Sequence, residues 1–74
     1  MSHLNEAIAE IEASLPALAT ASEAANALRC SPRHLRRLIV AGRIGAMRER
    51  ESGSSRVIIP RAEIGRYLRS LVSP

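Results

Sequence analysis

Residues 31–42 read SPRHLRRLIVAG, a stretch that carries the start, one apolar face and the end of a short helix. Ser31 can accept a hydrogen bond from the free amides of a first turn, and Pro32 suits the first helical position because no N–H is needed there. Gly42 is typical of the residue after a last turn, since the left-handed conformation is easiest for glycine. The stretch therefore predicts a helix that begins at Pro32 and ends just before Gly42.

The side chains of this predicted helix divide into two faces. Three aliphatic residues at i, i+3 and i+4 form a stripe that would dock on a core, namely Leu35, Leu38 and Ile39. At about 100° per residue, the opposite face carries Arg33, Arg37 and Val40, with His34 and Arg36 on the two flanks. Such a cationic face either binds a polyanion or only keeps a surface helix soluble. The neighbouring segments favour the first interpretation.

Length and composition predict one small domain with no membrane segment. The chain has 74 residues with four Pro and four Gly, near the lower size limit for a stable core without cross-links. Its one cysteine cannot form an internal disulfide, and no apolar run approaches the roughly 20 residues that cross a membrane. The first residues do not resemble a secretion signal. We expect a cytoplasmic protein of bacterial, phage or mobile-element origin.

Charge is distributed unevenly along the chain. Residues 1–28 hold four Glu and no Arg, a charge of −4, whereas residues 29–74 hold 11 Arg and three Glu, a charge of +8; together they give the net +4. All basic residues are arginine, whose planar guanidinium suits phosphates and guanine edges, although a GC-rich genome would also enrich arginine. An acidic leading segment before a basic body favours a polyanion-binding domain with a polar accessory element.

Two helices are predicted before residue 31. The first is an amphipathic helix within residues 1–17 that stops near Pro16, because apolar residues recur at i, i+4, i+7 and i+11, at Leu4, Ile8, Ile11 and Leu15. It would pack on the domain or on another copy of the chain. Residues 20–23 read TASE, a capping box that begins a short alanine-rich helix through Leu28. Only a few residues then separate two short helices, as in a helix-turn-helix.

The pattern after Gly42 changes from helical to strand-like. Residues 44–50 and 56–59 flank a Gly/Ser-rich segment, which predicts a β-hairpin, or wing. Its arginines would line a ribbon able to follow a phosphate backbone or enter a minor groove, or would only protect exposed strand edges: Arg48, Arg50 and Arg56. A last helix from residue 61 should close the core with Ile64, Tyr67, Leu68 and Leu71.

Residues 18–71 resemble the small winged helix-turn-helix domains of the excisionase and MerR-like superfamily. The resemblance lies in LATASEAA at residues 18–25, LRCSPR at 28–33, LI at 38–39, AGRI at 41–44, and IPRAEI at 59–64 with YL at 67–68. It implies an α+β, mostly helical fold: a winged helix-turn-helix domain over residues 18–74, preceded by an extra N-terminal helix over residues 1–17. It also implies a recognition helix in the major groove of double-stranded DNA.

Transferred to this chain, the resemblance assigns two groups of DNA contacts. The recognition helix would supply Ser31, Arg33, His34, Arg36 and Arg37, with Arg33 and Arg37 on base edges. The wing and its flanks would supply mainly sequence-independent affinity through Arg43, Arg48, Arg50 and Arg56.

The same resemblance suggests a biological role. Only three residues follow Leu71, so the effector-sensing helices of MerR regulators are not expected, and the length resembles excisionases, which bend DNA beside an integrase or recombinase and often self-associate on it. The leading hypothesis is a recombination directionality factor. A small transcriptional regulator that blocks or recruits RNA polymerase would use the same contacts, and a third alternative is a protein-interaction module with a basic face. The N-terminal helix either contacts a neighbouring copy or only enlarges the core.

Other chemistries find little support in the sequence. Cys30 and His34 are one turn apart, but a zinc site needs three or four ligands, so neither a metal nor another cofactor is expected. No nucleophile-base-acid set, carboxylate pair or phosphate-binding glycine loop is recognisable, so the chain is not expected to be an enzyme. Tyr67, its one aromatic residue, offers no stacking platform for single strands. Duplex DNA is the expected target.

Overall fold

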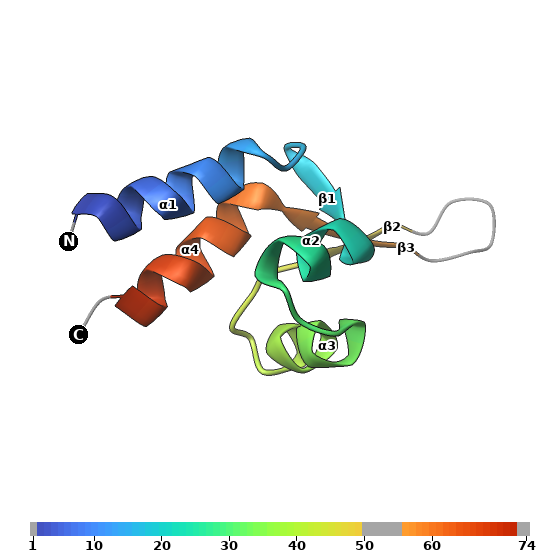
Figure 1. Ribbon diagram of the computed structural model, residues 1–74. Helices are drawn as coiled ribbons and strands as arrows, with labels where there is room; N and C mark the ends of the chain where they lie inside the picture. Colours follow the sequence, from blue (N-terminus) through green and yellow to red (C-terminus); the bar gives the residue numbers. More distant parts are fainter. Residues whose placement is uncertain (1, 50–55, 73–74) are drawn as a thin grey trace.

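The computed structural model describes residues 2–49 and 56–72. Within these residues, helices pack around a small antiparallel sheet (Figure 1). In chain order the elements are α1 (Ser2–Ala13), β1 (Leu18–Thr20), α2 (Ala21–Leu28), α3 (Pro32–Val40), β2 (Met47–Glu49), β3 (Arg56–Pro60) and α4 (Arg61–Val72). This order agrees with the predicted mostly helical α+β fold. The predicted turn at residues 51–55 and Arg50 lie outside the described residues.

Helix α2 begins with the predicted capping box. The Thr20 hydroxyl accepts a hydrogen bond from the Glu23 amide at 3.1 Å, and the Glu23 carboxylate accepts one from the Thr20 amide at 2.9 Å. The helix ends at Arg29, which adopts the left-handed conformation with φ of 55°. The amide of Cys30 then bonds to the carbonyl of Ala25, which closes the turn before α3.

Helix α3 has the two ends that its sequence predicted. Ser31 caps it by accepting a hydrogen bond from the His34 amide at 3.1 Å, and Pro32 occupies the first turn. After the last turn, Gly42 takes a φ of +77°, and the amide of Arg43 bonds back to the carbonyl of Leu38 at 2.9 Å. This reversal at Gly42 directs the chain away from the helix and toward β2.

The sheet has the strand order β1-β3-β2, with both pairs antiparallel. Strands β2 and β3 form the predicted hairpin, called the hairpin below, in which Glu49 lies opposite Arg56. Strand β2 begins later than expected: Ile44 is only 1% exposed and plugs the core, and the Gly45 amide bonds to a side chain of α4. Strand β1, which pairs Ala19 with Ile59, was not predicted.

The core lies where the helices meet the central strand β3. Its largest fully buried side chains come from four different segments and are Leu35, Ile44, Ile59 and Ile64. Leu38 is buried as expected, and Ile39 packs partly buried against this cluster. The alanine-rich face of α2 completes the core with Ala24 and Ala25, whose small side chains permit close packing.

Helix α1 lies alongside α4, at the left of Figure 1, and runs antiparallel to it. Ile8 is buried and Ile11 is half-buried, and Leu15, which follows the helix, is buried as well, so the apolar face of α1 is used largely within the chain itself. The expected faces are incomplete at the distal end of this pair, where Leu4 is 44% exposed and Leu71 is 57% exposed. The prediction that Leu71 closes the core is therefore wrong, because in the last turn of α4 this side chain lies at the surface.

Candidate nucleic-acid interface

The outer face of α3 is exposed and cationic. Arg33 and Arg37 are both exposed, and Val40 on the same side is 80% exposed, while Leu35 beneath them is buried. Over residues 2–49 and 56–72, the ion pairs of the structure involve none of the α3 arginines. This face therefore combines a rigid, capped helix with positive charge that no described acidic side chain neutralises.

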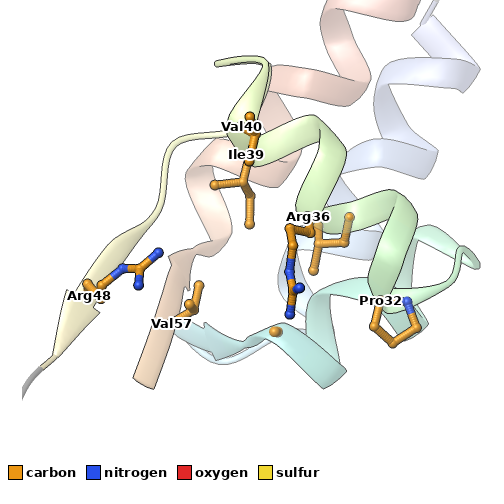
Figure 2. Close-up of a pocket in the computed structure, with 8 residues that line it drawn as sticks. Pro32, Arg36, Ile39, Val40, Arg48 and Val57 are labelled. Carbon is orange, nitrogen blue, oxygen red and sulfur yellow. The ribbon is translucent and has the colours of Figure 1, made fainter. Parts of the chain in front are cut away.

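A cleft of about 210 Å³ separates α3 from the hairpin (Figure 2). Its floor is largely apolar and includes Leu35, Ile39 and Val57. Arg36 of α3 and Arg48 of β2 both line it, and Figure 2 shows them reaching toward it from different elements. The fold thus brings together one arginine from each of the two predicted groups of DNA contacts. These two arginines are twelve positions apart in the sequence.

The other hairpin arginines differ in their surroundings. Arg56 is 68% exposed along its side chain and donates a hydrogen bond to Glu49 at 2.9 Å across the hairpin. An exposed pair of this kind contributes little to stability and exchanges readily for another anion. Arg50 lies outside the described residues. Arg48 is thus the described hairpin arginine that lines the cleft.

Arg43 contacts α4 and does not lie beside the arginines of α3. Its guanidinium carbon lies 5.4 Å from the centre of the Tyr67 ring, a cation-π contact. Its carbonyl accepts a hydrogen bond from Arg66 at 3.2 Å. These contacts tie the segment after α3 to the last helix.

His34 points to the side of α3 opposite the cleft. It lines a small pocket of about 130 Å³ whose other walls are apolar or sulfur-bearing, namely Leu28, Cys30, Leu38, Tyr67, Leu68 and Leu71. Among the described residues, no group of three or more His, Cys, Asp or Glu side chains could hold a metal ion. Because Arg36 lines the cleft and His34 lines this pocket, the two side chains occupy opposite flanks of α3.

The turn between α2 and α3 holds candidate contacts that the sequence interpretation missed. Asn26 and Arg29 line a shallow depression together with Ser31, whose side chain caps α3. Amides at a helix N-terminus attract phosphates, and Arg29 adds a charge beside them. Its position two residues before the cap was the available signal.

The arginines of α4 are bound within the fold. Arg61 donates to the Leu15 carbonyl at 3.0 Å, Arg66 bonds to Glu63 at 2.7 Å, and Arg69 bonds to Glu12 at 2.8 Å. The hydrogen bonds from Arg66, and next the one from the Gly45 amide, hold the pKa of Glu63 below its usual value. The hydrogen bond from Arg69 does the same to the pKa of Glu12.

These contacts separate the arginines by availability. Those of α4 are committed to carboxylates and carbonyls of the same chain, whereas Arg33, Arg36 and Arg37 lie on one exposed helix. No described helix is long and apolar enough to span a membrane. The available positive charge is therefore concentrated on α3 and the strand beside it.

A family model described as a helix-turn-helix domain matches residues 20–71. The matched range begins at the residue that caps α2 and reaches nearly to the end of α4. No curated protein and no solved structure matches the chain. Because the match covers well over half of its residues, the chain belongs to the helix-turn-helix domain family, a family of DNA-binding domains.

Proposed function

We propose that the protein binds double-stranded DNA sequence-specifically, with α3 in the major groove and the hairpin against the adjacent backbone or minor groove. The observation that carries this proposal is the outer face of α3, where Arg33 and Arg37 are exposed on a helix capped at both ends. An α-helix fits the major groove of B-DNA, in which arginine on guanine is the commonest specific contact.

The contacts divide by the information they carry. Arg33 and Arg37 read base edges, and His34 and Arg36 reach bases or phosphates on either flank. Ser31 and the first-turn amides hold a phosphate. The remaining affinity comes from backbone contacts that do not depend on sequence, made by Arg48, Arg50 and Arg56, with Arg43 nearby.

The cleft between α3 and the hairpin supports this arrangement. A DNA strand that separates a major from a minor groove would pass between a helix in one and a ribbon in the other. Arg36 and Arg48 line the cleft and would face a phosphate there, with the sugar over the apolar floor at Val57. If the arginines of α3 served only to keep the helix soluble, an arginine from the hairpin would not need to line the same cleft.

Binding should be measured on two duplexes, one selected from a randomised library and one scrambled version of it. Arg33→Ala and Arg37→Ala should each reduce the specific-to-scrambled affinity ratio by about 1–3 kcal/mol of discrimination. Arg48→Ala should weaken both duplexes alike and reduce the slope of log affinity against log salt by about 0.9.

A matched control lowers the net charge by one without touching the interface. Asn5→Glu, on the exposed side of α1, lowers the net charge by one and should leave the specificity ratio unchanged. If wild type binds no duplex at low salt, or if binding does not weaken as salt rises, DNA is not the ligand and an acidic protein partner becomes the better reading of the basic face.

For the biological role, we propose an excisionase-like recombination directionality factor that bends DNA beside an integrase. The support is the resemblance of residues 18–71 to the excisionase and MerR-like superfamily. A small transcriptional regulator would use the same surface. The two are separated by a bending assay with the selected site moved along a fragment, followed by excision assays with the integrase encoded nearby. An unbent site and no effect on excision would favour the regulator.

A further inference from the structure

We propose that Glu63 of α4 is a positioning residue for DNA recognition: it holds the segment that joins α3 to β2, and so sets the orientation of the recognition helix relative to the hairpin. This inference rests on the proposed function. It differs from the contacts assigned above because Glu63 is acidic and would be repelled by DNA rather than bind it.

One carboxylate oxygen of Glu63 is the centre of the contact. It accepts hydrogen bonds from the Gly45 amide at 2.8 Å and from two nitrogens of Arg66, at 2.7 and 3.1 Å. Arg66 also donates to the Arg43 carbonyl at 3.2 Å, and the Arg43 guanidinium stacks over Tyr67. Residues 63, 66 and 67 lie on one face of α4, at i, i+3 and i+4, and together hold residues 43–45.

The close approach of Glu63 depends on Gly45. A Cβ built on Gly45 would lie 2.8 Å from the same carboxylate oxygen, closer than such atoms normally come. A side chain at this position would require the carboxylate to move from its place beside the Gly45 amide, whose hydrogen bond it accepts. Gly45 is not among the residues with positive φ, so space rather than backbone conformation explains the glycine.

The segment held by Glu63 connects the two elements that would touch DNA. It leaves α3 through Gly42 and enters β2 at Met47, and between them Ile44 is buried in the core. Ile44 fixes one point of the segment, and the bonds to Arg43 and Gly45 fix the points on either side. Because the segment is fixed at three successive residues, it leaves α3 little freedom to change its orientation relative to the hairpin.

Positioning and electrostatics predict opposite results for loss of this carboxylate. Removing a negative charge raises the affinity of a protein for any duplex, because DNA is a polyanion. Loosening the recognition helix lowers affinity only for the selected duplex, because bidentate base contacts require accurate geometry. The sign of the change on the selected duplex therefore tests the proposal.

The test uses three variants at the contact and one control. Glu63→Ala removes the acceptor and the charge, and Glu63→Gln keeps an acceptor for the Gly45 amide. Gly45→Ala displaces the carboxylate with no change in charge. Glu10→Ala on the exposed side of α1 is the matched control for loss of one negative charge. Binding to the selected and scrambled duplexes is measured well below the unfolding temperature of each variant, with folding verified by circular dichroism.

We expect Glu63→Ala and Gly45→Ala to reduce the specific-to-scrambled ratio by about tenfold, the discrimination of roughly one base contact. Glu63→Gln should retain most of the ratio. Glu10→Ala should raise binding to both duplexes slightly and leave the ratio unchanged.

Three outcomes would overturn the inference. Glu63→Ala behaving like Glu10→Ala would mean that the carboxylate acts only through its charge. Folded Glu63→Ala and Gly45→Ala with lower melting temperatures but unchanged ratios would show a purely structural contact. Equal loss of the ratio in Glu63→Gln and Glu63→Ala would show that the hydrogen bond from the Gly45 amide does not position the segment. A wild-type protein that binds no duplex would instead refute the proposed function itself.

Discussion

The arginines of this chain have two kinds of surroundings, which their hydrogen bonds distinguish. Arg66 and Arg69 each bond to a carboxylate of the same chain, whereas Arg33 and Arg37 are exposed on α3. Sequence alone ranked the arginines by position along predicted elements and left those of α4 out of the site. It could not show that Arg43 leans on Tyr67 or that Arg56 faces Glu49, because both contacts join separate elements.

The capping box at Thr20 permits a test at a single side chain. Thr20→Ala should lower the free energy of unfolding by about 1 kcal/mol, because the Glu23 amide loses its acceptor. The companion change Ser22→Ala, in the same first turn and also exposed, should cost less than about 0.5 kcal/mol. Urea denaturation measures both. Equal losses in the two variants would contradict the capping role.

Among the elements, those with local end signals were predictable and those that depend on distant partners were not. The start of α2 and both ends of α3 follow from Thr20, Ser31 and Gly42, all of which act on neighbouring residues. Strand β1 is only three residues long and exists because β3 pairs with it across some forty positions of sequence. The C-terminal end of α2 was not signalled either, because the left-handed position there is occupied by Arg29 and not by a glycine.

The candidate site shows the same division. The cationic face of α3 was readable from helical spacing, because a period of 3.6 residues fixes which side chains share a face. The cleft that joins Arg36 to Arg48 was not, because it requires the angle between α3 and the hairpin. A long-range contact also crosses the proposed boundary between the N-terminal segment, residues 1–17, and the domain over residues 18–74. Leu15 of the first segment packs in the hydrophobic core of the second.

The packing of α1 on α4 provides a test at the level of elements. An alanine Cβ at Gly65 would overlap the Glu12 carboxylate, which lies over this part of α4 and bonds to Arg69. Gly→Ala inside a helix ordinarily stabilises by up to about 1 kcal/mol. We expect Gly65→Ala to show little of this gain in wild type and to recover it in a Glu12→Ala background.

A double-mutant cycle by urea denaturation measures the coupling between the two positions. If Gly65→Ala changes the free energy of unfolding equally in both backgrounds, the glycine is not required by the contact with Glu12.

For the molecule as a whole, the carboxylates that join its parts predict a loss of stability in acid. Hydrogen bonds from Arg69 lower the pKa of Glu12, and hydrogen bonds from Arg66 lower the pKa of Glu63. Because both values lie below those of the unfolded chain, the folded state binds fewer protons. The stabilisation is complete above the unfolded pKa of about 4.3 and is lost as the pH falls through the folded values.

We therefore expect the free energy of unfolding to fall as the pH decreases below about 4.3. A Glu12→Gln, Glu63→Gln double variant should lose less over the same interval. Urea denaturation at a series of pH values compares the two proteins, and parallel curves would contradict the assignment.

The antiparallel pairing of α1 with α4 brings the beginning of one helix and the end of the other to the side of the molecule opposite the hairpin (Figure 1). Anything joined to either helix there, such as a fluorescent reporter, a surface anchor or a second binding module, would extend away from the hairpin. The molecule can thus be tethered or labelled through these helices on the side away from the hairpin. Single-molecule experiments that pull on or track the protein along DNA can use this arrangement directly.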